Sequence, residues 1–251
     1  MPGHASAAID RRPEGSQVPT LDFVGVDALT FDCYGTLIDW EAGLSTAFAS
    51  ILTAHRVEAE RDDVLERYAR HEAAVEAGPY RTYREVLAAG LRGVADELDF
   101  EPSADEVATF SGSVADWPPF ADSAAALDRL HRRFRLGVIT NCDDDLFDAS
   151  ARRLGTAFDW VITAQQAGSY KPNEANFHLA FERLGLSRER IVHVAQSLYH
   201  DHVPAKRLGL RTVWINRRHD RPGSGATPPA TATPDAAFPE MESFAAAVAP
   251  D

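Results

Sequence analysis

The order of helix and strand signals after residue 117 constrains the fold of this 251-residue chain most strongly. Four short apolar runs, typical of buried strands, occupy 136–140, 160–163, 190–195 and 212–216. A segment with helical periodicity precedes each of them; these segments are 121–133, 145–154, 174–184 and 202–208. Strands that alternate with helices form a parallel sheet covered by helices on both faces. We therefore expect an α/β fold with a doubly wound parallel sheet.

One more strand and a long helical stretch come before this pattern. Residues 24–31 are predicted to form a buried strand, and about 75 residues of helical periodicity follow it without a strand signal. We divide the chain into a disordered tail over 1–21, a Rossmann-like α/β core built from 22–38 and 117–251, and an inserted all-helical cap domain over 39–116.

Composition excludes several classes of protein and of partner. Hydrophobic residues make up 45% of the chain and charged residues 25%, as in an ordinary globular protein, and no apolar run approaches the roughly 20 residues that span a membrane. The net charge of −13 argues against nucleic acid and anionic membranes as partners. No secretory leader is recognisable, so we expect a cytoplasmic protein. A homodimer is the one macromolecular assembly that we keep as an alternative to the monomer.

Polar residues lie where the predicted strands end. Asp32 follows the first strand, Thr140 and Asn141 end the second, Lys171 precedes a later helix, and Asp201 follows the strand at 190–195. Ligands of open α/β sheets bind at the carboxyl ends of the strands, so these residues are candidates for a shared site. Each also has an ordinary structural interpretation, as a turn or helix cap for the Asp, Thr and Asn residues and as a solvated surface side chain for the lysine.

The order and spacing of these residues resemble the haloacid dehalogenase superfamily. The chain carries a strand ending in Asp32 with Gly-Thr-Leu three residues later, a strand ending in Thr140-Asn141, a Lys171-Pro pair, and a strand followed by a loop that contains Asp201. The resemblance extends from residue 22 to about residue 218 and implies the α/β core with a helical cap.

Two departures from the magnesium-dependent phosphatases of that superfamily indicate the reaction. Tyr34 stands where those enzymes carry a second aspartate as acid and base, and Gln196 replaces a carboxylate that binds magnesium. A phenol with a pKa of about 10 is a poor acid–base catalyst near neutral pH, and magnesium prefers carboxylate ligands. Displacement of a halide needs neither group. The Asp-x-Tyr-Gly-Thr-Leu segment is similar to the type II 2-haloacid dehalogenases, which act without metal or other cofactor.

This resemblance implies a role for each motif residue in the hydrolysis of short 2-haloalkanoic acids. Asp32 would be the nucleophile that forms an ester, Thr36 and Lys171 would orient it and keep it charged, and Asp201 would position the water that hydrolyses the ester. The expected ligand is a small anionic haloacid. Because the protein as a whole is acidic, a local cluster of positive charge must hold this anion. The predicted substrate-binding residues are Tyr34, Thr140, Asn141, Ser197, Arg81 and Arg84.

Some features leave alternatives open. The arginine segment that helps bind halide in the family's dehalogenases is missing, and we expect Arg81 or Arg84, which flank Tyr83, to reach the site from the cap, with Arg56 as a further candidate. A phosphatase that holds magnesium through a rebuilt site is the first alternative function. A non-catalytic binding protein on the same scaffold is the second. His200 is interpreted as a partly exposed residue at the start of a helix.

Overall fold

The computed structural model describes residues 22–219 and 227–250, so the predicted tail 1–21 lies outside the described residues. The described chain contains one parallel sheet in the order β3-β2-β1-β4-β5-β6. Its strands are β1 (Ala28–Phe31), β2 (Arg135–Thr140), β3 (Trp160–Thr163), β4 (Ile191–Ala195), β5 (Arg211–Ile215) and β6 (Ala236–Phe238). The strand order reverses direction at β1, which confirms the predicted doubly wound α/β fold.

The register of the sheet aligns the carboxyl ends of the central strands. Phe31, the last residue of β1, pairs with Val138 on β2 and with Val194 on β4. Asp32 therefore leaves the sheet between Ile139 and Ala195 on its two neighbours. This is the edge of the sheet at which the sequence predicted a site.

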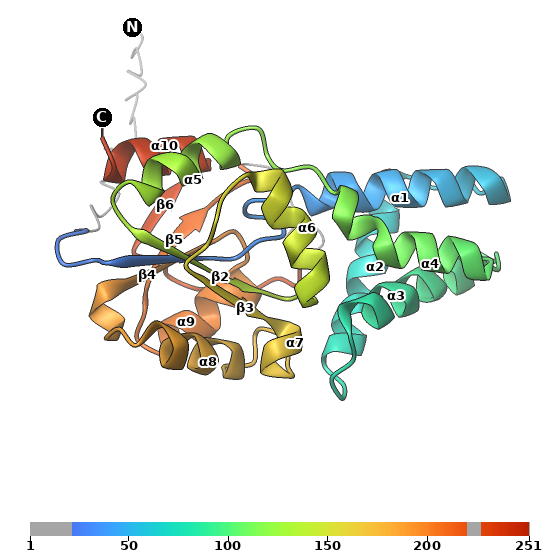
Figure 1. Cartoon of the computed structure of the whole chain (residues 1–251). Helices are drawn as coiled ribbons and strands as arrows, with labels where there is room; N and C mark the ends of the chain where they lie inside the picture. The colour runs from blue at the N-terminus through green and yellow to red at the C-terminus, as the bar shows by residue number, and fades with distance from the viewer. Residues whose placement is uncertain (1–21, 220–226, 251) are drawn as a thin grey trace, which may run out of the picture.

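Helices cover both faces of the sheet because side chains alternate along each strand. On β1, Leu29 and Phe31 pack into one apolar cluster, whereas Ala28 packs into another on the opposite face. The first cluster includes residues of α5, α6 and α10, and the second includes residues of α8 and α9 (Figure 1). These helices are α5 (Ser123–His131), α6 (Asp144–Leu154), α8 (Ala175–Leu184), α9 (Val203–Arg207) and α10 (Met241–Val248); α7 (Ala164–Ala167) is a single turn after β3.

The first four of the α-helices between β1 and β2 form a lobe beyond the carboxyl edge of the sheet (Figure 1). An aromatic cluster holds the lobe together: the rings of Phe48 and Phe110 lie 4.7 Å apart, and that of Tyr68 lies 5.9 Å from Phe48. We call this lobe the cap. Its helices are α1 (Trp40–His55), α2 (Arg61–Glu76), α3 (Tyr83–Glu97) and α4 (Ala104–Gly112), followed by a 3₁₀ turn over Ser113–Asp116.

Three details differ from the sequence-based expectation. The first strand begins at Ala28 rather than at residue 24, because a turn precedes it in which Gly25 has a φ of 76°. The three-residue edge strand β6 has no sequence signal of its own. A π-helical turn over Leu198–His202 carries Asp201 before α9 begins. Such turns are frequent at functional sites.

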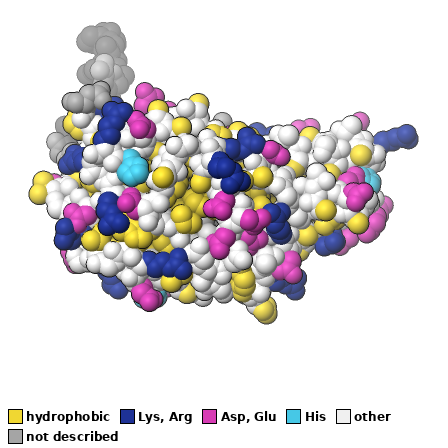
Figure 2. All heavy atoms as spheres, in the orientation of Figure 1, with side chains coloured by type: hydrophobic (Ala, Val, Ile, Leu, Met, Phe, Trp, Pro, Cys, Tyr) yellow, Lys and Arg dark blue, Asp and Glu magenta, His cyan; other side chains and the backbone are white. Residues whose placement is uncertain are grey.

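Charged side chains of both signs are mixed on the visible surface, and acidic ones gather over α6, where the sheet domain faces the cap (Figure 2). The first turn of α6 contains Asp144 and Asp145. Among the helices of the described residues, none is both long and apolar enough to cross a membrane.

The contact between α1 and Trp117 gives a test of the packing between cap and core. A Cβ atom added at Gly43 would lie 2.3 Å from the indole ring of Trp117, which is buried. We expect Gly43→Ala to lower the free energy of unfolding by about 1–3 kcal/mol, although alanine alone favours a helix by about 1 kcal/mol. Urea unfolding measures the change. In the control Gly112→Ala, the nearest atom is 3.7 Å away, and an equal loss of stability in both variants would contradict this packing.

Candidate active site

The turn after β1 brings the Asp32 carboxylate to the edge of the sheet. Gly35 has a φ of 92°, a backbone conformation that favours glycine, and it lets the chain fold back so that Thr36 faces the carboxylate. The Thr36 hydroxyl donates a hydrogen bond of 2.7 Å to Asp32 Oδ2 and accepts one of 2.9 Å from the backbone N–H of Gln196. The second contact leaves the Thr36 proton directed at Asp32.

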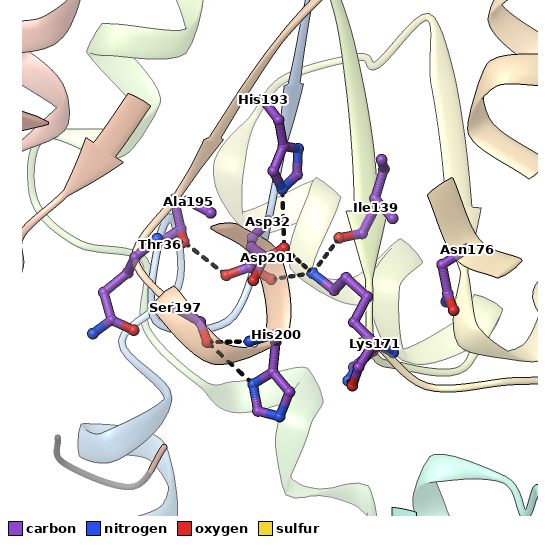
Figure 3. A network of polar contacts seen from close by, with 12 residues as sticks. Asp32, Thr36, Ile139, Lys171, Asn176, His193, Ala195, Ser197, His200 and Asp201 are labelled. Carbon is purple, nitrogen blue, oxygen red and sulfur yellow. Dashed lines mark hydrogen bonds and ion pairs between the residues drawn. The ribbon is translucent and has the colours of Figure 1, made fainter. Parts of the chain in front are cut away.

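The ammonium group of Lys171 joins three elements of the core (Figure 3). Lys171 Nζ donates to Asp32 Oδ1 at 2.9 Å, to Asp201 Oδ1 at 2.7 Å and to the carbonyl oxygen of Ile139 at 2.7 Å. Its side chain is 1% exposed, so all three of its protons have acceptors inside the protein. The ordinary interpretation of Lys171 as a surface residue is excluded.

A buried histidine supports the second carboxylate. His193 Nε2 lies 2.9 Å from Asp201 Oδ1 (Figure 3). His193 Nδ1 lies 2.9 Å from the hydroxyl of Thr30. Asp201 Oδ1 therefore receives two partners. Asp201 Oδ2 is buried and has no hydrogen-bond partner among the described residues. It is a free acceptor beside the nucleophile candidate.

The two carboxylates titrate differently although they share Lys171. Burial and the negative charge of Asp201 raise the pKa of Asp32 above its ordinary 3.8, while Lys171 and Thr36 oppose that rise. Burial would also raise the pKa of Asp201, but Lys171 and His193 outweigh it and hold that pKa below its ordinary value. As the pH falls, Asp32 is therefore protonated before Asp201.

The structure brings some of the predicted substrate-binding residues to this place and gives others a different task. The Asn141 side chain accepts from the Lys171 N–H at 2.7 Å and donates to the Lys171 carbonyl at 3.0 Å, so its amide positions the lysine. The Thr140 hydroxyl is buried without a partner among the described residues and does not line the pocket. The expectation that Thr140 binds a substrate carboxylate is therefore corrected, whereas Asn141 does line the pocket and its contact with a substrate stays a prediction.

Tyr34 and Ser197 do line the pocket next to Asp32. The Tyr34 hydroxyl lies 3.0 Å from Ser150 Oγ and 3.3 Å from Cys142 Sγ, and burial raises its pKa well above the ordinary 10.0. Ser197 Oγ accepts from the His200 N–H at 2.9 Å and lies 3.2 Å from His200 Nδ1 (Figure 3). His200 thus lies in the pocket, which the sequence did not indicate.

The cap closes the pocket from the other side. The pocket has a volume of about 50 Å³, and the cap residues that line it are Trp40, Glu72, Glu76 and Tyr83. The core carboxylate of Asp143 fixes this arrangement, because it accepts from the N–H groups of Tyr83 at 2.9 Å and of Arg84 at 3.2 Å. The hydroxyl of Tyr170 adds a bond of 2.8 Å to the Arg81 carbonyl.

The prediction that Arg81 or Arg84 reaches the pocket is wrong for this structure. The Arg84 guanidinium forms an ion pair with Asp145 on α6, and its side chain is 43% exposed. The Arg81 side chain is exposed as well, and neither arginine lines the pocket. Arg81 lies just before α3 and Arg84 in its first turn, and each contacts the core through its backbone, Arg81 through Tyr170 and Arg84 through Asp143.

Sequence reasoning missed His193, Glu72 and Glu76. His193 is the polar residue inside an apolar strand, and nothing in its spacing indicates Asp201 as its partner. The two glutamates had a usable signal. Glu72 follows Val64 and Tyr68 at intervals of four residues, so it continues the apolar face of α2, where a glutamate is unexpected.

Comparison with known proteins places these motifs in a family. Residues 26–207 match the family model of the haloacid dehalogenase-like hydrolases. The chain is 25% identical to haloacetate dehalogenase H-2 of a Moraxella species over 198 residues, which cover 76% of this chain and 86% of the relative. It is 26% identical to the pyrimidine 5'-nucleotidase YjjG of Escherichia coli over 137 residues, 53% of this chain and 61% of that protein.

Solved structures agree on the fold. The L-2-haloacid dehalogenase of Xanthobacter autotrophicus superposes with a TM-score of 0.76 at 18% identity, over 88% of this chain and 97% of that one. A defluorinating L-2-haloacid dehalogenase superposes with a TM-score of 0.75 at 23% identity, over 88% and 94% of the two chains. Together with the parallel sheet and the Asp32–Lys171–Asp201 cluster, the match over 26–207 establishes that the chain belongs to the haloacid dehalogenase-like hydrolase family.

Proposed function

We propose that this hydrolase is a dehalogenase, which replaces a halogen on a saturated carbon by a hydroxyl group through an ester on Asp32, without a metal ion. The observation that carries the proposal is the position of Lys171 Nζ, 2.9 Å from Asp32 and 2.7 Å from Asp201. An ammonium in this place keeps a buried carboxylate ionised and aimed, as nucleophilic attack requires.

The donor set around Asp32 does not fit a magnesium ion. Lys171 already takes one oxygen of each of the two aspartates, and a cation bound between them would meet its ammonium at close range. Gln196 supplies no charge, and the Tyr34 hydroxyl is turned to Cys142 and Ser150. Among the described residues, no three His, Cys, Asp or Glu side chains are grouped so that they could hold a metal.

Two steps account for the reaction with the groups present. In the first, an oxygen of Asp32 forms a bond to the carbon that bears the halogen, and the halide leaves with the electron pair of the broken bond. In the second, water attacks the ester carbonyl of Asp32, and the alcohol leaves as the carboxylate is restored. The overall reaction converts an organohalide and water into an alcohol, a halide ion and a proton. In this step Asp201 Oδ2, which has no hydrogen-bond partner among the described residues, would accept a hydrogen bond from that water.

Short 2-haloalkanoic acids are the reference substrates for this proposal, because the names of several relatives include them. The geometry of Asp32 and Lys171 supports the chemistry at the carbon–halogen bond. The cap residues that line the pocket would determine which other chemical groups a substrate can contain.

Removal of the nucleophile tests the first step. We expect Asp32→Asn to lower kcat for halide release by about 10³-fold or more, because a neutral amide cannot form the ester. Halide release in the presence of an organohalide panel measures the change. Asp148→Asn removes the same charge from an exposed position on α6 and should retain full activity. Undiminished turnover by Asp32→Asn would contradict the proposal.

Chelation tests the independence from metal. Because Lys171 occupies the position between the carboxylates, halide release should be unchanged by excess chelator and should not rise when magnesium is added. The same preparations should be assayed for phosphate release from small phosphate esters. Phosphate release that requires magnesium, without halide release under any condition, would instead favour the phosphatase function that the nucleotidase relative suggests.

The pH profile tests which carboxylate acts. Only ionised Asp32 attacks, so kcat/KM should be full above the pKa of Asp32 and should fall as the pH drops through it. Because that pKa is raised, the fall in kcat/KM should begin above pH 3.8 and should follow the binding of a single proton. Asp201 has a lowered pKa and should not contribute to this limb. Constant kcat/KM down to pH 3.8, with the fold intact by circular dichroism, would exclude Asp32 as the titrating nucleophile.

A further inference from the structure

The part of the cap that faces Asp32 is acidic. Glu72 and Glu76 are one turn apart on α2, and both line the pocket together with Tyr83. The Glu72 residue is only 7% exposed. A buried carboxylate on the apolar face of a helix is unfavourable unless it is paired, so its presence calls for a partner.

Protein groups satisfy only part of these carboxylates. Glu72 Oε1 accepts hydrogen bonds from Tyr83 at 2.9 Å and from Tyr68 at 3.0 Å. Neither Glu72 Oε2 nor the carboxylate of Glu76 has a hydrogen-bond or ion-pair partner among the described residues. Burial raises the pKa of Glu72 to about 7, and burial together with the charge of Glu72 raises the pKa of Glu76 well above its ordinary value, although Lys171 opposes the rise at Glu76.

The pocket offers little to a negatively charged ligand. Lys171 is the one lysine or arginine among the described residues that line it, and its three protons are taken by Asp32, Asp201 and the Ile139 carbonyl. Burial lowers the pKa of His200 to about 4, so its imidazole is neutral at pH 7. A substrate carboxylate would find no free cation among the described residues that line this pocket, whereas an ammonium group would find free carboxyl oxygens on Glu72 and Glu76 and would stabilise their ionised form.

We propose that Glu72 and Glu76 determine specificity by binding a protonated amine, so that the substrate is a small organohalide with an ammonium group rather than a simple haloalkanoate. The ammonium donates to Glu72 Oε2 and to Glu76 while the halogen-bearing carbon lies against Asp32. This inference rests on the proposed dehalogenase function for its turnover, but the binding of the amine does not require that chemistry.

The experiment has a turnover arm and a binding arm. Halide release is measured with 3-chloropropylammonium, neutral chloroacetamide and anionic 2-chloropropionate. Binding of the halogen-free propylammonium and propionate is measured by calorimetry. We expect kcat/KM for the ammonium compound to exceed that for 2-chloropropionate at least about tenfold, and propylammonium to bind at least about tenfold more tightly than propionate.

Glutamine variants locate the effect. Glu76→Gln should weaken propylammonium binding and raise KM for the ammonium substrate about tenfold with little change in kcat, and Glu72→Gln with Glu76→Gln should abolish the preference for positive charge. Since Glu76 accepts no hydrogen bond from the described protein, its variant separates ligand binding from packing of the cap. Glu66→Gln, an exposed position on α2, makes the same charge change and should match the wild type.

The outcomes separate the two proposals. Tight binding of propylammonium without halide release from any probe would support the acidic site and overturn the dehalogenase function. Rapid halide release from 2-chloropropionate with no preference for the ammonium compound would support the dehalogenase and overturn the acidic site. The acidic site would also be overturned if the glutamine variants left the preference for positive charge unchanged. The same holds if none of the probes binds and none reacts.

Discussion

The site depends on one buried ammonium group. Lys171 Nζ donates each of its three protons to an acceptor from a different part of the core, namely Asp32 after β1, the Ile139 carbonyl on β2, and Asp201 after β4. A lysine buried this deeply stays charged only with such partners, and two aspartates so close together stay ionised only with such a cation. The hydrogen bonds of Asn141 to the Lys171 backbone and of His193 to Asp201 hold the three groups in register.

The cap adds a second, opposite electrostatic feature. Lys171 balances one of the two core aspartates, and α2 then brings Glu72 and Glu76 to the same pocket. In an active site that a lobe closes off from water, each of these charges interacts more strongly with a bound ligand. In the proposed function the core carries the groups for the reaction at the carbon atom, and we propose that the charge of the cap selects the substrate. The two can vary independently because the cap enters between β1 and β2 as one continuous segment.

Much of this could be predicted from the sequence, because alternation of helix and strand fixes a parallel sheet and its carboxyl edge collects the motif residues. Asp32, Thr36, Lys171 and Asp201 lie together as expected. The roles of Arg81 and Arg84 could not be predicted, since net charge says only that an anion would need a cation nearby, not where a helix directs its side chains. The Asn141 side chain has an acceptor oxygen and a donor N–H group, and any nearby backbone could pair with them. Only the fold reveals that both pair with the backbone of Lys171.

Transfer of isotopic oxygen tests the central claim, that Asp32 held by Lys171 is a covalent nucleophile. The enzyme is placed in ¹⁸O-labelled water with the organohalide it hydrolyses fastest, and the product and the peptide containing Asp32 are analysed by mass spectrometry. In a single turnover the account predicts an unlabelled product hydroxyl and one solvent oxygen in the Asp32 carboxylate. A labelled product with unlabelled Asp32 would mean that water attacks the substrate directly and would contradict the account.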